Sequence, residues 1–190
     1  MESAVEGSRT RVLTFGHGIA DATTIAELLH GAGVRELVDV RTAPGSKRNP
    51  DATRSAMQQW LPEAGIGYRW ERRLGGWRTA HADNPDTALR NRSFSGYAEH
   101  MRSAEFRAAV DDLLAGAATA LTAVMCAESV WWRCHRKMIA DHLTLVRGVD
   151  VGHLMHDGAV RPHRPSPEAR LDPDRGVLVY DAGQPPLGAG

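Results

Sequence analysis

The sequence predicts a single-domain α/β protein of three layers, with a mostly parallel central sheet flanked by helices. Short apolar runs alternate with amphipathic segments of helical length along most of the chain. A strand, a helix and a second strand follow one another within residues 12–40, and such a β-α-β unit builds a parallel sheet. The 190 residues suffice for one domain with a core. We expect this domain to span residues 11–182, between flexible ends at 1–10 and 183–190.

The first half of the chain predicts three strands and two helices. Asp21 can cap a helix that carries Ile25, Leu28 and Leu29 on one face. Two prolines and a glycine make residues 42–50 a loop, and a second helix is expected after it. The expected strands are residues 12–15, 37–40 and 66–70, and the second helix covers residues 52–64.

The second half begins with an irregular stretch at residues 72–93 and continues with helices and strands in alternation. Apolar residues spaced for one buried face predict a helix over residues 97–114. Further strands are expected at 120–125, 149–155 and 177–180, a helix at 136–146, and an extended proline-rich segment at 161–167.

Composition narrows the class of protein. Hydrophobic residues make up 42% of the chain and the formal net charge is zero, so the overall field does not favour a polyanionic partner. Two cysteines can form only one disulfide bond, which is too few to stabilise a secreted disulfide-rich protein of this size. The N-terminus shows no signal peptide, and no apolar run approaches the ~20 residues that span a bilayer. We therefore expect a cytoplasmic protein without membrane contact.

Reactive or charged side chains follow three of the expected strands. His17 comes after the first strand, Asp39 and Arg41 end the second, and Cys126 and Glu128 follow the strand at 120–125. Ligands of open parallel sheets bind beyond the carboxyl ends of the strands, so this edge is the expected site. The structural alternatives are a turn role for His17 and, for Asp39, bonds to loop N–H groups or pairing with Arg41.

The loop between Cys126 and Arg136 carries the most specific signal. Cys134 is placed where a helix should begin, and a helix N-terminus together with neighbouring His135 and Arg136 favours a thiolate. Glu128 can act as an acid or a base if its surroundings shift its pKa. The alternative is a pair of buried, inert cysteines.

The histidine content also raises the possibility of a metal site. The candidate ligands are Cys126, Cys134, His135, His153 and His156. The Cys-x7-Cys-His spacing is not a familiar zinc pattern, so we expect neither a bound metal nor another cofactor.

Arginine and tryptophan are interleaved in residues 69–78, and Trp131 and Trp132 stand beside Arg133. Arginine with tryptophan on loops suits phosphate contact combined with base stacking. The alternative is core tryptophans flanked by solvated arginines. The residues expected to contact phosphates or bases are Arg41, Ser46, Lys47, Arg48, Arg72, Arg73, Trp77, Arg78, Trp131, Trp132 and Arg136.

Several motifs together resemble the bacterial and archaeal DUF488 family. They are residues 14–18, 37–50, 74–76, 94–98, 124–128 and 134–141, and the resemblance extends from about Val12 to Met155. It implies an α/β fold with a central sheet, and it supplies no reaction beyond a loose association with DNA repair. The positions that match the family pattern are His17, Asp39, Arg41, Pro44, Ser46, Arg48, Asn49, Pro50, Gly75, Gly76, Cys126, Glu128, Cys134, His135 and Arg136.

Three functions follow from these features. The first is an enzyme that removes or processes a base in nucleic acid, DNA rather than RNA, in the manner of a repair glycosylase. The second is a cysteine-dependent sulfur-transfer or redox enzyme, since residues 37–41 are also similar to the opening strand of rhodanese-like domains. The third is a non-enzymatic module that binds a nucleotide or a protein. The expected catalytic residues are His17, Asp39, Cys126, Glu128, Cys134 and His135.

Overall fold

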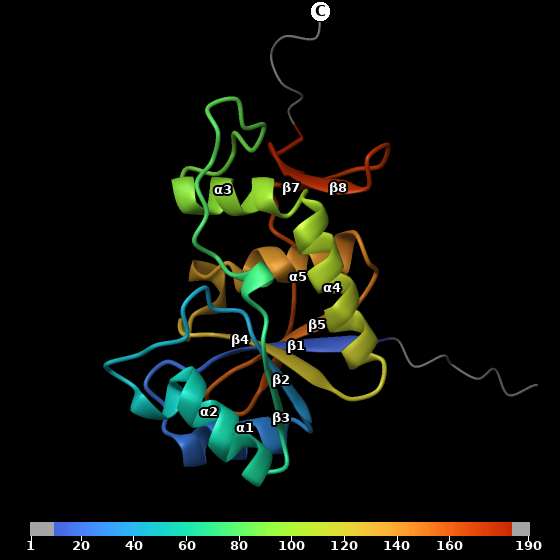
Figure 1. The fold of residues 1–190 in the computed structure, drawn as a ribbon. Helices are drawn as coiled ribbons and strands as arrows, with labels where there is room; N and C mark the ends of the chain where they lie inside the picture. Colours follow the sequence, from blue (N-terminus) through green and yellow to red (C-terminus); the bar gives the residue numbers. More distant parts are fainter. Residues whose placement is uncertain (1–9, 184–190) are drawn as a thin grey trace, which may run out of the picture.

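A computed structural model describes residues 10–183, which form a six-stranded sheet, five α-helices and a separate two-stranded sheet (Figure 1). Five strands of the large sheet run parallel, and β6 at one edge is antiparallel. The strand order across the sheet is β3 (Gly67–Trp70), β2 (Glu36–Asp39), β4 (Thr122–Cys126), β1 (Arg11–Gly16), β5 (Asp150–Leu154) and β6 (Val160–Pro162).

Helices cover both faces of this sheet, so the predicted three-layer α/β fold is confirmed. The helices α1 (Ala22–Gly31) and α2 (Arg54–Glu63) pack on one face, and α4 (Ala104–Ala117) and α5 (Arg136–Leu145) pack on the other (Figure 1). Alternate residues of the buried strands pack against the helices on opposite faces of the sheet. In β1, Val12 faces α4 and α5, and Leu13 faces α1 and α2.

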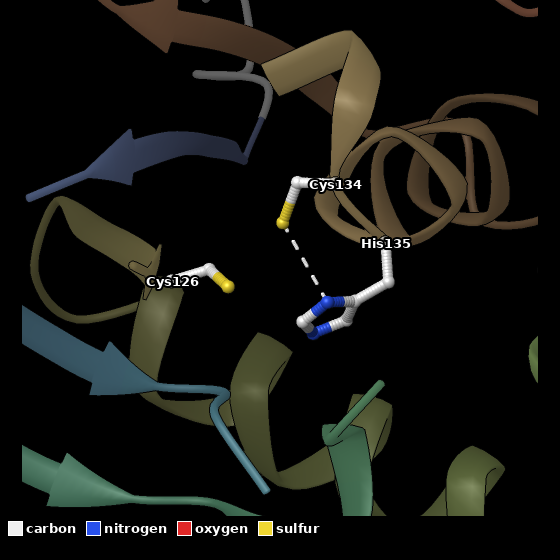
Figure 2. Close-up of side chains that lie close together, drawn as sticks. All are labelled: Cys126, Cys134 and His135. Carbon is white, nitrogen blue, oxygen red and sulfur yellow. Dashed lines mark hydrogen bonds between the residues drawn. The ribbon is translucent and has the colours of Figure 1, made fainter. Parts of the chain in front are cut away.

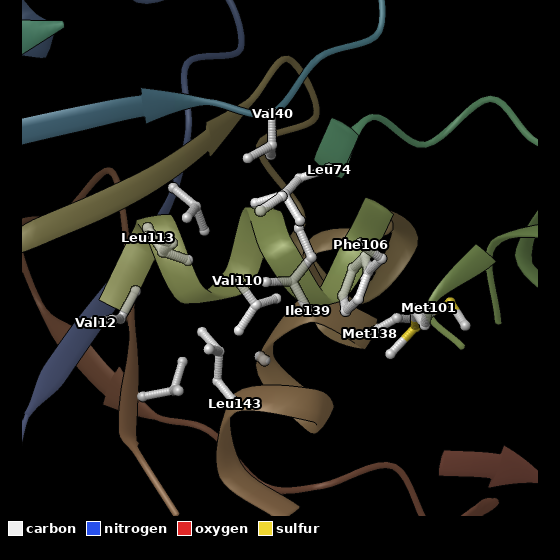
Figure 3. Close-up of a cluster of buried hydrophobic side chains, with 14 of the residues drawn as sticks. Val12, Val40, Leu74, Met101, Phe106, Val110, Leu113, Met138, Ile139 and Leu143 are labelled. Carbon is white, nitrogen blue, oxygen red and sulfur yellow. The ribbon is translucent and has the colours of Figure 1, made fainter. Parts of the chain in front are cut away.

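The larger of the two cores lies between the sheet and the helices α4 and α5 (Figure 3). Phe106, Val110 and Leu113 of α4 meet Ile139 and Leu143 of α5, and all five side chains are fully buried. The spacing of three and four residues on α4 supplies one apolar stripe, as the sequence indicated. This packing holds the N-terminus of α5 against the ends of the strands.

The expected single helix over residues 97–114 is wrong, because the structure contains two helices there. The first, α3 (Arg92–His100), begins at Asn91, whose side chain accepts the N–H groups of Ser93 and Phe94. The chain then turns, and Ser103 caps α4 by accepting the N–H of Phe106. A serine that satisfies the free N–H groups of a new helix explains the break.

The late strand expected at residues 177–180 is confirmed as β8 (Val177–Tyr180), but it lies outside the central sheet. It pairs with β7 (Ala169–Asp172), which the sequence did not predict, and the hairpin lies beside α3 (Figure 1). The predicted flexible ends lie outside the described residues, apart from Thr10 and Gly183. Within residues 10–183, no helix combines the length and the apolar character needed to cross a membrane.

A buried chain of hydrogen bonds ties β1 to the segment before β7. Asp141 accepts a hydrogen bond from Nε2 of His163 at 2.9 Å, so Nδ1 of His163 accepts from Nε2 of His153. The remaining His153 nitrogen then accepts from the hydroxyl of Thr14 at 2.7 Å. Every ring nitrogen of the two histidines has a hydrogen-bond partner in this arrangement.

We expect acid to destabilise the fold because three buried histidines are held neutral. Burial lowers the pKa of His17 and of His142 to about 4, and that of His153 to about 3. Between pH 6.5 and about 4 the unfolded chain therefore binds more protons than the folded chain, and stability falls as the pH falls.

The expected loss is on the order of a few kcal/mol by pH 4, measured as the free energy of unfolding in denaturant at a series of pH values. A His142→Gln variant should show a shallower dependence, because one of the three groups is removed. A stability that stays flat from pH 7 to pH 4 would contradict this expectation.

Candidate functional site

Three parallel strands end at one edge of the sheet and bring the predicted site residues together there. His17 follows β1, Asp39 ends β2, and Cys126 ends β4 between them. The N–H of His17 donates to the carbonyl of Cys126 at 3.0 Å, and that of Gly18 donates to the carbonyl of Ala127 at 2.9 Å. The prediction that these strand ends meet is confirmed.

Asp39 and Arg41 form a buried ion pair at this edge. Both side chains are almost inaccessible, and Arg41 reaches the two carboxylate oxygens through Nε at 2.9 Å and Nη2 at 2.6 Å. The hydroxyl of Tyr68 donates to the same carboxylate at 2.7 Å. The structural alternative for Asp39 is therefore the one observed. Because its carboxylate is already occupied, Asp39 is poorly placed to activate water, and Arg41 is poorly placed to bind a phosphate.

His17 completes this network as a neutral ring. Its Nε2 accepts a hydrogen bond from Nη1 of Arg41 at 3.1 Å, and its Nδ1 donates to the carbonyl of Gly18 at 2.8 Å. Burial, reinforced by the charge of Arg41, lowers the pKa of His17 to about 4. A ring held in this way supports the neighbouring loop and does not exchange protons near neutral pH.

The two cysteines and His135 converge beside this network (Figure 2). Cys126 is half-buried at the end of β4, and Cys134 is buried just before the N-terminus of α5. The two sulfurs and a ring nitrogen of His135 lie within 4.8 Å of one another. Nε2 of His135 bonds the carbonyl of Val40 at 3.0 Å and must be its donor. Nδ1 therefore faces Cys134, whose sulfur is 3.6 Å away, and is free to accept its proton.

Arg136 supplies a buried positive charge next to Cys134. Its side chain is 1% exposed, and its Nε donates to the sulfur of Cys134 at 3.4 Å. Its Nη2 donates to the carbonyl of Glu128. Among residues 10–183, no carboxylate lies within ion-pair distance of this guanidinium. A Cys134 thiolate is thus the one anionic partner that the described chain offers to Arg136.

The surroundings of Cys134 stabilise its thiolate. The neighbouring thiol of Cys126 lowers the pKa of Cys134, as does the positive charge of Arg136, and these effects outweigh its burial. The nearby Cys134, together with burial, raises the pKa of Cys126. The start of α5 adds the favourable end of the helix dipole. Of the two thiols, Cys134 is therefore the one that loses its proton first.

A pocket of about 230 Å³ opens onto Cys126 and His135. Its walls come from the loop after β2, the segment around Trp77 and the end of β4. The lining residues are Arg41, Thr42, Ala43, Gly45, Ser46, Gly76, Trp77, Cys126, Ala127 and His135. Cys134 is not among them, so a molecule in the pocket meets Cys126 first.

The same three side chains could hold a soft metal ion. Two sulfurs and one imidazole nitrogen would supply three ligands and leave the fourth to water or substrate, as in catalytic zinc sites. The buried cation of Arg136 beside Cys134 already balances one thiolate and repels a divalent ion, which favours a metal-free thiol pair. The other candidate ligands lie elsewhere, since His153 bonds His163 and His156 bonds the carbonyl of Gly16.

The remaining predicted residues either hold a loop in place through hydrogen bonds or lie at the protein surface. Glu128 is exposed and its carboxylate accepts the N–H of Val130, so it orders the loop and does not line the pocket. Ser46 accepts the N–H of Asn49 in the same supporting manner. Arg73 is neutralised by Glu71 and Asp112.

The two adjacent tryptophans differ in their surroundings. Trp131 stacks flat on His153, with ring centroids 3.9 Å apart, so one face of the indole is already covered and is not available to the base that the sequence led us to expect. Trp132 is 52% exposed. Other predicted contacts that face solvent at least in part are Lys47, Arg48, Arg72, Trp77 and Arg78.

The sequence did not identify Tyr68 or the role of Gly76. A Cβ at Gly76 would lie 2.6 Å from Nδ1 of His135, so only glycine allows this close approach. The Gly75–Gly76 pair was visible in the sequence, but His135, which Gly76 contacts, is 59 positions further along the chain.

We expect Gly76→Ala to disturb His135 and to lower the free energy of unfolding by about 1–3 kcal/mol, because the new methyl group overlaps the ring. The reactivity of the cysteines toward iodoacetamide should fall with it. Gly45→Ala is the matched control, since a Cβ there meets nothing within 4 Å and the glycine also lines the pocket. Equal effects of the two substitutions would contradict this account.

The fold and the site together define an α/β protein with a thiol pair at the carboxyl edge of its parallel sheet. The sequence matches the family model described as "Domain of unknown function DUF488" over residues 21–143, which is most of the chain. The chain belongs to the DUF488 family. No curated protein and no solved structure gave a significant match.

Proposed function

We propose that the protein is a cysteine-dependent enzyme that performs sulfur transfer or thiol–disulfide exchange at the Cys126–Cys134 pair. The observation that carries the proposal is the buried Arg136, which donates to the sulfur of Cys134 and has no carboxylate partner in the described chain. A buried cation of this kind favours a thiolate beside it. Activated thiolates are the nucleophiles of thiol enzymes.

Cys126 is the attacking sulfur because it lines the pocket, whereas Cys134 is 5% exposed. Transfer of the Cys126 proton to the Cys134 thiolate, whose sulfur lies within 4.8 Å, places the negative charge on Cys126. Attack on a disulfide substrate forms a bond between the Cys126 sulfur and one substrate sulfur, and the other substrate sulfur leaves as a thiolate.

Cys134 then completes the exchange. It gives its proton to Nδ1 of His135 and attacks the Cys126 sulfur, which releases the second substrate thiolate and forms the Cys126–Cys134 disulfide. Two electrons have passed from the pair to the substrate. A cellular dithiol is required to reduce the pair again, and a persulfide substrate would be attacked by Cys126 in the same way.

The test is the reaction of the reduced protein with a small aromatic disulfide, followed by absorbance and by intact mass. We expect the wild type to release two thiolates and to end with an internal disulfide. Cys134→Ser should retain one substrate half on Cys126, while Cys126→Ser should react far more slowly. A Cys126→Ser variant as fast as the wild type, or a Cys134→Ser variant without adduct, would reject the proposal.

Removal of a base from nucleic acid stays a prediction that the geometry supports less well. Its expected carboxylates are either buried in an ion pair, as Asp39 is, or outside the pocket, as Glu128 is. The exposed Trp132 and the basic Lys47 and Arg48 still suit contact with a single strand of nucleic acid. Oligonucleotide binding that weakens with salt, with base release lost in Glu128→Gln, would favour this function over thiol chemistry.

A further inference from the structure

We infer that the substrate of the thiol site carries a flat ring and an anionic group such as a phosphate, bound by Trp77 and by Arg72 and Arg78. This inference rests on the proposed function, because Trp77 lines the pocket that opens onto Cys126 and also lines a second hollow with Arg72 and Arg78. It extends that function by naming the chemistry of the molecule that the pocket takes.

The indole of Trp77 is available for stacking. Its side chain is 76% exposed, although the backbone beneath it is closely held. The N–H of Trp77 donates to Oγ1 of Thr42 at 3.3 Å. The preceding Gly75 and Gly76 approach Thr42 and His135 so closely that neither position has room for a side chain. A large ring on a rigid segment that contributes little to the core suits contact with a ligand ring.

Trp77 also lines a second hollow, of about 300 Å³, which carries free positive charge. Three arginines line it, and Arg73 is already neutralised by Glu71 and Asp112. Within the described part of the chain, Arg72 and Arg78 have no carboxylate at ion-pair distance. Nε of Arg78 donates to the carbonyl of Gly75, and its terminal nitrogens have no hydrogen-bond partner there.

The opposing charge in this hollow is that of Glu105, which also lines it. Two unpaired guanidinium groups against one carboxylate leave the hollow positive, and a guanidinium binds phosphate in a bidentate manner. An anionic group of the substrate is therefore expected here.

The two hollows are neighbours, since Trp77 and Thr42 line both. Their volumes of about 230 and 300 Å³ are small, and small-molecule sites generally measure about 300–1,000 Å³. A ring on Trp77 with its phosphate on the arginines would place the rest of the molecule toward Cys126. The size of the hollows favours a compound like a mononucleotide over a long nucleic-acid strand.

The test is titration calorimetry at low salt with adenosine monophosphate, adenosine and a short single-stranded oligonucleotide. The measurement uses the wild type and the Cys126→Ser/Cys134→Ser double variant, so that binding is read without thiol chemistry. We expect the monophosphate to bind both proteins and to bind more tightly than adenosine. Arg72→Met, Arg78→Met and Trp77→Ala should each weaken it roughly tenfold or more. Arg175→Met, which removes an exposed arginine from the β7–β8 turn, is the control.

Each other outcome overturns a defined part of the account. Absence of binding, or binding that the three substitutions leave unchanged, would reject this inference. The thiol function would then still be decided by the reaction with the aromatic disulfide. Adenosine that binds as tightly as the monophosphate would reject the anionic group. Binding of the oligonucleotide but not of the monophosphate would reject a small-molecule substrate. Monophosphate binding without any thiol reactivity would reject the proposed chemistry and keep the ligand site.

Discussion

Asp39→Asn is expected to lower the free energy of unfolding by about 3–5 kcal/mol, because it leaves Arg41 as an uncompensated buried charge. The amide keeps the size of the carboxylate and can still accept a bond from Tyr68, so the loss reports the charge and not a cavity. Denaturant unfolding at neutral pH, followed by circular dichroism, measures it. The same change should disorder the loop after β2, which forms one wall of the pocket.

Asp112→Asn is the matched control for this prediction. Asp112 also pairs with an arginine, Arg73, but its side chain is 60% exposed, so water screens the pair. We expect little change in stability from this substitution. Equal losses from Asp39→Asn and Asp112→Asn would show that burial of the Asp39–Arg41 pair does not matter as proposed.

Arg136→Met is expected to abolish most of the thiol reactivity near pH 6. Removal of the guanidinium takes away the buried positive charge that stabilises the Cys134 thiolate, and the pKa of the pair should rise. A rise of one unit lowers the thiolate fraction about tenfold at a pH below the pKa, and the rate of alkylation falls with it. The measurement is the rate of iodoacetamide labelling of the folded protein.

Two further variants separate charge from folding. Arg133→Met removes an exposed arginine three positions before Arg136 and should leave the rate unchanged. Arg136→Lys keeps a positive charge and should lie between the wild type and Arg136→Met. If Arg136→Met folds and labels as fast as the wild type, the thiolate at Cys134 does not depend on this arginine.

The sequence predicted the sheet and the meeting of the candidate residues at one of its edges because both follow from local patterns. Apolar runs alternated with amphipathic segments, and residues such as Cys126 stood where a strand ended. Parallel strands bring their carboxyl ends to one edge, so the juxtaposition of His17, Asp39 and Cys126 followed from the fold class alone. The position of Cys134 at a helix start was likewise readable from the chain.

The roles of the individual side chains could not be predicted, because they depend on contacts between distant residues. Arg136 was expected to bind phosphate, yet it is buried against Cys134 and the carbonyl of Glu128. Trp131 was expected to stack on a base, yet His153 occupies one face of its indole. A guanidinium or an indole looks alike in sequence whether it faces solvent or the core, and only the packing decides.

The most direct test of the central claim is the pH dependence of cysteine alkylation in the reduced, folded protein, with each adduct located by mass spectrometry. The account predicts that Cys126 or Cys134 labels readily below pH 7, with an apparent pKa for the pair well below the ~8.5 of a free cysteine. A midpoint near ~8.5 or above, or thiols that label only after unfolding, would contradict a thiolate site.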